Sequence, residues 1–334
     1  MTRSALLTLL VGLAVAASLV AASDAGEILR LVSGAGWWGL LAVVALRLPQ
    51  ILFSAVGWAP LIAHPARPGW AALFRMRWIR DAVNALLPVA QLGGEFVRAQ
   101  LLVWRGVDTA GAGASVAVDL ATEMAALVAF AALGLAVLML VPHEGEAALG
   151  WLVFAAALCA AMAAGFVAAQ RWGLFRLLDR MLPRLTRNPV RAASGGGAPG
   201  LHDAVVRLHR EPGRLWASGA AHLASWLFGA LETWAALHVL GVEAGLAEAL
   251  VVESLSQAVR SVGFAVPGAI GVQEGGFVLA CGLFGIPAEQ AIALALVRRI
   301  RDVALGLPGV AAWRWGAMAG RGARPAAAAG RITP

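Results

Sequence analysis

Six apolar runs along the chain are each long enough to cross the hydrocarbon core of a lipid bilayer. A transmembrane helix needs about 20 predominantly apolar residues to span a core of about 30 Å. A helix also satisfies its own backbone hydrogen bonds, which lipid cannot do. We therefore expect an all-α, polytopic membrane protein with about six transmembrane helices: Ser4 to Ala22, Trp37 to Ala59, Ala114 to Val141, Leu149 to Ala169, Trp216 to Leu240 and Ala288 to Trp313.

The composition agrees with this reading, since 60% of the residues are hydrophobic and only 13% are charged. That is more apolar surface than one soluble core needs. A basic residue, an apolar run and small residues at the start would also fit a cleaved signal peptide. We favour a first span, because removing it would leave an odd number of crossings.

Two segments between the runs are too polar for a clean span and too apolar for a loop: Ala71 to Trp104 and Leu246 to Phe284. Both contain proline and glycine, and proline breaks a helix. Non-helical backbone at membrane depth is tolerated only where protein or water covers it. We therefore expect two re-entrant or broken helical hairpins in addition to the six spans.

The two broken segments have similar sequences when one is aligned 179 residues after the other, which is the separation of Pro88 and Pro267. In each segment a glutamate, Glu95 or Glu274, follows the proline by seven residues. The same spacing relates three further pairs: Gly106 with Gly285, Asp119 with Arg298, and Glu123 with Asp302. Paired interruptions in two halves of a chain are the best sequence indication of a transporter's binding site. The alternative is a gene duplication without a surviving transport role.

Each half is expected to contain a span, a span, a broken hairpin and a span. Three crossings per half is an odd number, so the halves should be inserted upside down relative to each other, as an inverted repeat. We expect a single integral membrane domain over 1–320, with repeats at about 1–141 and 148–313. A flexible C-terminal tail is expected over 321–334.

Arginine is concentrated in the predicted loop 170–214, which holds nine arginines against three acidic residues. The positive-inside rule makes this loop cytoplasmic. Arg75, Arg77 and Arg80 fall on the same side when six spans are counted, and both termini do so too. The loop should face the anionic lipids of the inner leaflet. Nucleic acid is not an expected partner, because the loop does not interleave aromatic and basic residues.

Charged residues inside spans cost about 2.5 to 3.5 kcal/mol each at a helix centre and need a partner or water. Asp119 and Glu123 are four residues apart and share one face of the third span. Arg298, Arg301 and Asp302 share a face of the sixth span. Their related positions suggest that the two clusters meet. They would do so either as ion pairs or as a site where an arginine receives a lipid phosphate.

Further polar residues share helix faces near the second break. Glu253, Ser256, Gln257 and Arg260 form a stripe that lines either a cavity or a contact between packed helices. On the fifth span, the residues on one face could carry protons in a coupled transporter or could simply be hydrogen-bonded by neighbours. These residues are His222, Ser225 and Glu232.

The first break carries Asn84, Glu95 and Arg98, and the second carries Glu274. An acid in the first turn of a helix is favoured by the helix dipole and by free backbone donors. Glu95 and Glu274 are therefore expected where each broken segment resumes its helix. If the two helix starts point at one cavity, a lipid headgroup would bind there.

Several segments resemble the membrane domain of lysyl-phosphatidylglycerol synthases, a flippase-like family. They are Asn84 to Arg98, Val266 to Glu274, and the helix that contains Arg298 to Asp302. The step from Arg80 to Asp81, the run from Leu87 to Gly94 and the step from Val259 to Gly263 are similar to a stand-alone branch associated with hopanoid lipid biosynthesis. The resemblance implies an inner-membrane protein of bacteria that moves or handles a phospholipid or a hopanoid-type lipid. No acyltransferase-like domain follows Arg314, so aminoacylation by this chain alone is not expected.

Three function classes remain: a lipid flippase-like transporter, an intramembrane lipid-modifying transferase with Glu95 or Glu274 as general base, and a scaffold for lipid-synthesis enzymes. The common zinc, nucleophile and nucleotide motifs are missing, which favours a protein that is not an enzyme. Cys159 and Cys281 lie in apolar surroundings, so we expect no metal and no cofactor. The small residues from Gly111 to Ser115 would allow close helix packing, which leaves a homo-oligomer open.

Overall fold

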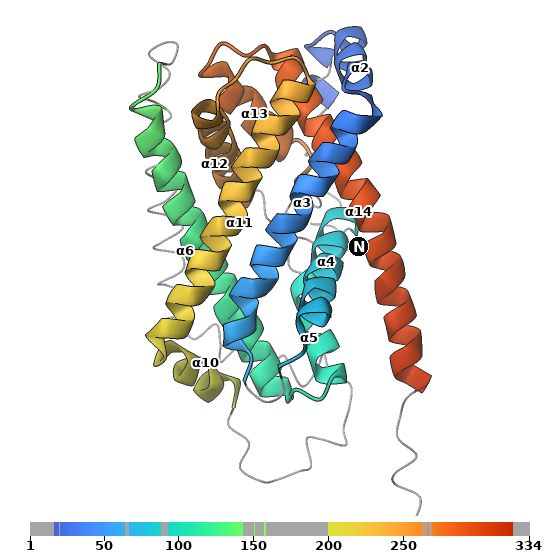
Figure 1. The fold of residues 1–334 in the computed structure, drawn as a ribbon, viewed down its shortest axis with the longest axis vertical. Helices are drawn as coiled ribbons and strands as arrows, with labels where there is room; N and C mark the ends of the chain where they lie inside the picture. The colour runs from blue at the N-terminus through green and yellow to red at the C-terminus, as the bar shows by residue number, and fades with distance from the viewer. Residues whose placement is uncertain are drawn as a thin grey trace, which may run out of the picture.

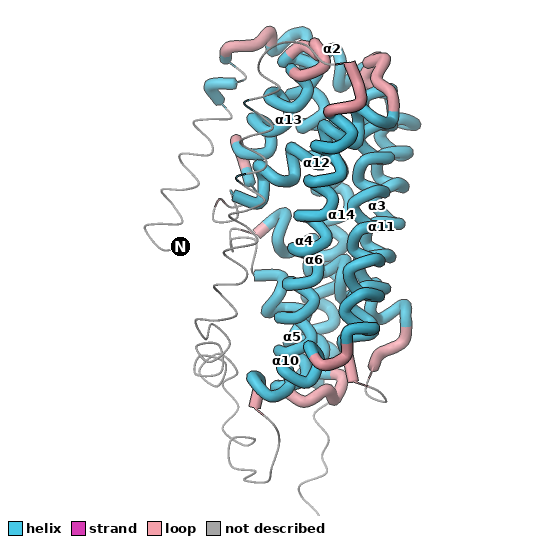
Figure 2. Tube along the Cα trace, turned by 90° about the vertical axis from the view of Figure 1, so that its left-hand side faces the viewer, coloured by secondary structure: helices cyan, strands magenta, loops and turns pink. Residues whose placement is uncertain are grey.

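The computed structural model describes residues 17–19, 21–63, 67–87, 93–142, 150, 157, 200–262, 266 and 269–322. Within these ranges every regular element is a helix (Figure 2), as the sequence predicts. In chain order the elements are α2 (Ala25–Gly34), α3 (Gly36–Trp58), the 3-10 turn η1 (Ala59–Leu61), α4 (Trp70–Leu86), α5 (Gly93–Trp104), α6 (Thr109–Leu138), α10 (Leu201–His209), α11 (Pro212–Val239), α12 (Leu246–Val262), α13 (Val272–Gly282) and α14 (Ala288–Gly322).

The long helices α3, α6, α11 and α14 run along the length of the molecule (Figure 1) and match four of the six predicted spans. Among the described helices, two are long and apolar enough to cross a membrane on length and composition: Gly36–Leu61 and Thr109–Leu138. Helix α14 is more polar because Arg298, Arg299, Arg301 and Asp302 interrupt it.

Several predicted features lie wholly or mostly outside the described residues. They are the run from Ser4 to Ala22, the run from Leu149 to Ala169 with Cys159, the loop 170–214 before residue 200, Pro88, Pro267, and the tail beyond Gly322.

Each predicted broken segment forms two short helices that pack against each other. Helices α4 and α5 form the first hairpin, and α12 and α13 form the second. The α4–α5 hairpin lies toward the end of the molecule that carries α10, whereas the α12–α13 hairpin lies toward the end that carries α2 (Figures 1 and 2). The two hairpins therefore occupy opposite ends of the bundle formed by the long helices.

The helix boundaries in the two halves keep the spacing found in the sequence. Helix α5 begins at Gly93 and α13 at Val272, while the long helices that follow begin at Thr109 and Ala288. Both pairs of starting residues are therefore 179 positions apart. The similarity between the two segments extends from residue types to the places where their helices start.

The turn between each hairpin and the next long helix has the same backbone geometry in both halves. Gly106 and Gly285 have φ angles of 93° and 66°, a region that glycine adopts without the steric cost of a Cβ atom. In both turns the N–H of the next residue donates to the carbonyl five positions earlier. This bond ends the preceding helix in a similar way in each half.

The first hairpin depends on a close approach at Gly94. Its backbone N–H donates to Oδ1 of Asn84 at 2.7 Å, which satisfies one of the free donors at the start of α5. A Cβ atom at Gly94 would lie 2.4 Å from the carbonyl oxygen of Arg80 and 2.8 Å from Asn84 Oδ1. A side chain at this position therefore collides with backbone that cannot easily move.

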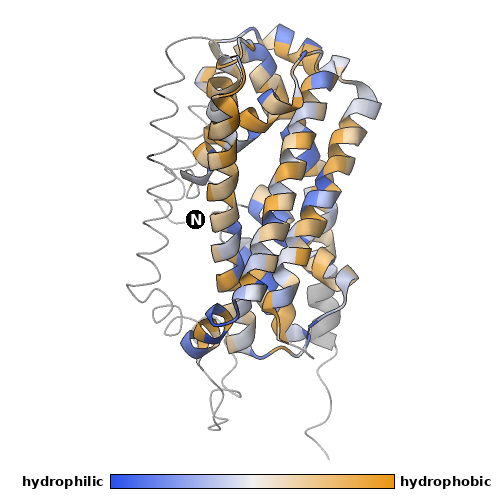
Figure 3. Ribbon diagram, turned by 60° about the vertical axis from the view of Figure 1, so that its left-hand side comes forward, coloured by the Kyte–Doolittle hydropathy of each residue, from blue (hydrophilic) through white to orange (hydrophobic). Residues whose placement is uncertain are grey.

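The two largest apolar clusters of the described residues make up most of the core. One joins residues of α11, α12, α13 and α14 with α2, and the other joins residues of α3, α4, α5 and α6. Figure 3 shows hydrophobic residues along the long helices, interrupted by hydrophilic residues between them. The small residues Ala112, Ala114 and Ser115 are buried within the chain itself, so they do not offer a surface to a second copy.

We predict that Gly94→Ala lowers the free energy of unfolding by about 1 to 3 kcal/mol, because the added methyl group overpacks the hairpin. The matched control is Gly219→Ala in α11, where a Cβ atom meets nothing within 4 Å. The control should be neutral or stabilising by up to about 1 kcal/mol, because alanine is the better helix former. Thermal unfolding of both variants in detergent tests this, and equal stabilities would contradict the close approach.

Candidate functional site

A first cluster of buried ion pairs joins α4, α5 and α6. Asp119 of α6 is fully buried, and its Oδ2 accepts hydrogen bonds from Arg77 of α4 and Arg98 of α5. Glu123, one helical turn further along, lies 2.7 Å from Arg77 and 3.1 Å from Arg80. Buried charges cost free energy unless they are paired and hydrogen-bonded. The arginines of the first hairpin supply these partners to α6.

Glu95 belongs to the same cluster. It is the third residue of α5, which confirms that an acid lies in the first turn of the resumed helix. Its Oε1 is 2.6 Å from Nε of Arg80, and its Oε2 accepts from Arg98. Glu95 is 6% exposed, so its carboxylate holds the two helices of the hairpin together.

A second cluster joins α11, α12 and α14. Arg298 of α14 lies 2.7 Å from Glu253 of α12. Arg301 contacts Glu232 of α11 and lies 2.6 Å from Asp302. Arg298 and Arg301 are 3% and 5% exposed, and Glu232 is fully buried. The second half of the chain therefore neutralises its own buried charges.

Glu274 lies at the start of α13, where its Oε2 accepts the backbone N–H of Gly271 at 2.7 Å. Its Oε1 lies 3.1 Å from Arg299 of α14. The first contact satisfies a free donor at the helix start, and the second connects α13 to α14. The prediction of a first-turn acid is thus confirmed here as well.

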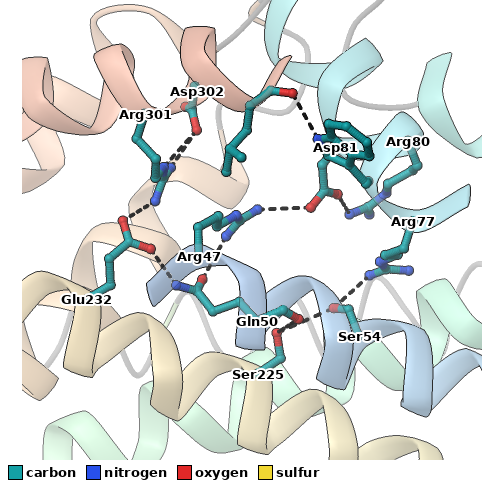
Figure 4. A network of polar contacts seen from close by, with 12 residues as sticks. Arg47, Gln50, Ser54, Arg77, Arg80, Asp81, Ser225, Glu232, Arg301 and Asp302 are labelled. Atoms are coloured by element: carbon teal, nitrogen blue, oxygen red, sulfur yellow. Dashed lines mark hydrogen bonds and ion pairs between the residues drawn. The ribbon is translucent and has the colours of Figure 1, made fainter. Parts of the chain in front are cut away.

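A hydrogen-bonded path through α3 joins the two clusters (Figure 4). Arg47 donates to Asp81 at 3.0 Å and to Gln50 at 2.7 Å. Gln50 in turn donates to Glu232 of the second cluster. Asp81 also accepts from Arg80 at 2.9 Å, which completes the path to the first cluster. Sequence analysis missed Arg47 and Gln50, although two polar residues three apart in an apolar run were a usable signal.

The expected ion pairs between the two clusters are not formed. We expected Arg298 or Arg301 to pair with Asp119 or Glu123, but every arginine–carboxylate pair of these four residues lies within one half of the chain. The prediction was wrong because nearer partners lie in the same half: the hairpin helices supply them to Asp119, Glu123 and Arg298, and α11 supplies Glu232 to Arg301.

Arg77 and Arg80, which the sequence analysis counted only as arginines on the cytoplasmic side, belong to this buried network. Arg77 is fully buried, and both side chains lie in the ion-pair cluster. Their spacing from Asp81, at four residues and one, places all three close together on α4. That grouping was the signal for a buried network.

A cavity of about 370 Å³ lies among α3, α4, α6, α11, α12 and α14. The first helices of both hairpins, α4 and α12, contribute to its wall. Four arginines and three carboxylates line it: Arg47, Arg80, Arg260, Arg301, Asp81, Glu123 and Asp302. Within the described ranges no group of three or more His, Cys, Asp or Glu side chains is arranged to hold a metal ion.

The polar stripe of α12 divides between the cavity and the protein interior. Gln257 and Arg260 line the cavity, whereas Glu253 and Ser256 are buried in the interior. Gln257 donates to Glu253 at 2.8 Å, so both readings of the stripe hold in part. Of the other polar residues named in the sequence analysis, Asn84, His222 and Ser225 line the cavity, and Glu232 does not.

Arg260 differs from the other arginines on the wall, because no hydrogen bond or ion pair joins it to another residue of the described chain. The spacing of 179 residues gives a reason. Arg260 corresponds to Asp81, and the partner of Asp81, Arg47, corresponds to Trp226. Tryptophan has no charge to pair with a guanidinium, so the second half lacks the counterpart of the Arg47–Asp81 pair.

The fold and this site define an all-helical membrane protein with a charged cavity between two broken hairpins. The family model of the lysylphosphatidylglycerol synthase TM region matches residues 9–309. The chain belongs to this family, which confirms the resemblance drawn from the sequence. No curated protein gives a significant match to the chain.

The pairing within each half can be tested by double-mutant cycles. Arg298→Ala should lower the free energy of unfolding by about 3 to 5 kcal/mol, because it leaves a buried carboxylate unpaired. Combined with Glu253→Ala, it should show a coupling of about 0.5 to 3 kcal/mol. Combined with Asp119→Ala, the two losses should add to within about 0.5 kcal/mol. Unfolding in detergent measures all three effects, and strong coupling to Asp119 would show that the two clusters touch.

Proposed function

We propose that the protein is a lipid flippase-like transporter of the bacterial cytoplasmic membrane, which moves a phospholipid or a hopanoid-type lipid between leaflets. The observation that carries the proposal is the cavity between the hairpins, with the unpaired Arg260 on its wall. A guanidinium presents five donors in a planar fork that matches phosphate oxygens. A buried polar group without a partner calls for an explanation, and a headgroup phosphate supplies one.

A second unpaired donor supports the same site. Nε1 of Trp226 has no hydrogen-bond partner, and Trp226 lines the cavity together with Arg260. Both groups only donate hydrogen bonds. Two unpaired donors on one wall favour a ligand that presents several acceptor oxygens, as the phosphate of a phospholipid does.

The arrangement of the hairpins supports transport by alternating access. Opposed broken segments that meet at a central site are typical of transporters built from inverted repeats. The two hairpins lie at opposite ends of the bundle, and their helix starts keep one spacing. In our proposal the halves form an inverted repeat, and movement of one half against the other exposes the cavity to each leaflet in turn.

The geometry gives less support to the two alternatives. A transferase would need a carboxylate free to act as a base, but Glu95 lies between two arginines and Glu274 caps α13 and contacts Arg299. A scaffold for other enzymes would have no use for a buried, charged cavity. Formation of a modified lipid by the purified protein would still select the transferase.

We place α10 at the cytoplasmic surface, with both chain termini on the same side. Helix α10 buries Leu201 and Val205 and exposes Arg207 and Arg210. Such a two-faced helix suits the boundary between protein, headgroups and water. Its arginines, with those of the preceding loop, would attract anionic lipids of the inner leaflet by about 1 kcal/mol each.

We predict that Arg260→Gln slows the exchange of a fluorescent phospholipid between leaflets of proteoliposomes by about tenfold or more. A hydrogen bond to a charged group contributes about 1.5 to 3 kcal/mol, and 1.4 kcal/mol is a factor of ten. The control is Arg30→Gln, since Arg30 is an exposed residue of α2 paired only with Glu27. The control should exchange lipid at the unaltered rate, and equal rates for both variants would place the site elsewhere.

The orientation is tested by single cysteines at Gly34 in α2 and Gly213 in α11. A Cβ atom at either position meets nothing within 4 Å. With the two native cysteines replaced by serine, a membrane-impermeant maleimide should label Gly34→Cys in intact spheroplasts. Gly213→Cys should react only after the membrane is opened. The reverse pattern would invert the topology.

A further inference from the structure

His222 of α11 is a buried titratable residue that the proposed headgroup site does not use. Its side chain is 1% exposed and lies on the cavity wall. Its Nε2 is 2.8 Å from Oδ1 of Asp119. Its Nδ1 is buried and has no hydrogen-bond partner.

The contact with Asp119 determines which ring nitrogen is open. A carboxylate accepts hydrogen bonds, so Nε2 carries the hydrogen and donates it to Asp119. In the neutral imidazole the other nitrogen, Nδ1, then has a free lone pair. A carboxylate behind a histidine fixes this tautomer and stabilises the imidazolium that forms when Nδ1 gains a proton.

Several groups face the imidazole from the helices packed against it. Asp119 and Glu123 face it from α6, and Arg77 and Arg98 reach these carboxylates from α4 and α5. From α3, the backbone of Gly57 lies against the ring. On α11 itself, Ser218 and Ser225 are uncharged. Arg80 of α4 also reaches Glu123, and Glu95 of α5 pairs with Arg80 and Arg98. Three carboxylates are thus matched by three arginines, and no excess positive charge repels an added proton.

The other ionisable groups on the described cavity wall are less able to exchange a proton. Arginine does not lose its proton in proteins. Asp81, Glu123 and Asp302 each accept from at least one arginine, which holds them as carboxylates. Histidine, in contrast, changes charge between about pH 5 and 8. The imidazole of His222, with its open Nδ1, is therefore the group on the described wall whose chemistry suits binding and releasing a proton.

We propose that His222 is a proton-binding site that couples proton movement to lipid movement, an inference that rests on the proposed function. A proton from cavity water binds to Nδ1 and makes an imidazolium beside the headgroup site. The added positive charge favours an anionic headgroup in the cavity. When the lipid leaves on the other side, the proton returns to water there. One proton accompanies each monoanionic headgroup, so the cycle moves no net charge.

The test uses purified protein in liposomes that contain an anionic fluorescent phospholipid and a trapped pH-sensitive dye. An imposed pH difference should speed net lipid movement toward the alkaline side at least threefold, and protons should enter only when lipid moves. His222→Gln keeps the size of the side chain and a donor for Asp119 but cannot take up a proton. Its exchange rate, at whatever absolute level, should be the same with and without the pH difference.

The matched control is His238→Gln, because His238 is exposed near the end of α11 and bonds the carbonyl of Trp234. This variant should keep the threefold response. A response retained by His222→Gln would overturn the proposal. If that variant does not fold, the same measurement on the wild-type protein tests the proposal. Lipid exchange that does not depend on the pH difference would overturn proton coupling but would not contradict lipid transport. No exchange above protein-free liposomes at any pH would overturn the proposed function itself.

Discussion

The structure depends most on one buried carboxylate, Asp119, which holds four helices together. It accepts hydrogen bonds from Arg77 of α4, Arg98 of α5 and His222 of α11, while its own backbone belongs to α6. A charge in a membrane interior costs several kcal/mol unless partners surround it. The first hairpin can therefore hold its place only by presenting both arginines to α6. This requirement holds the hairpin in the membrane interior. A segment of its length and polarity would not be expected to insert there without these ion pairs.

The second half also neutralises a buried charge on its long helix, but there the charge is positive. Arg298 stands at the position that corresponds to Asp119, and the hairpin helix α12 supplies Glu253 as its partner. In both halves, then, a charge on the long helix after the hairpin is neutralised by the hairpin's first helix. The two halves differ at the cavity, where the Arg47–Asp81 pair of the first half has no counterpart in the second. Asp81 pairs with Arg47, but Trp226 stands where Arg260 would need a carboxylate, so the buried Nε of Arg260 has no hydrogen-bond partner in the described chain.

The sequence predicts the elements of this fold better than their contacts. The long helices α3 and α6 follow from apolar length, and the hairpins follow from proline and glycine in segments that stay partly apolar. Glu95 and Glu274 follow from helix-start chemistry, which is local. The partners of Arg298 could not be predicted, because spacing along a helix gives the face of a residue and not the helix opposite. The partners of Arg77 could not be predicted for a related reason, since a charge before a broken segment suits a loop as well as a buried cluster.

The polar contacts within and between the halves are of different kinds, and this difference bears on movement. Within each half, ion pairs such as Arg298 with Glu253 are buried, and breaking one costs about 3 to 5 kcal/mol. Between the halves, Asp119 contacts His222 of α11, and a second path runs through Arg47 and Gln50 of α3, where hydrogen bonds contribute about 0.5 to 3 kcal/mol each. A displacement of one hairpin relative to the other should therefore separate the contacts of α3 before it separates the clusters. Because α4 packs against α14 and α12 packs against α6, such a displacement would also slide each hairpin along the long helix of the other half, and the cavity lies among these helices.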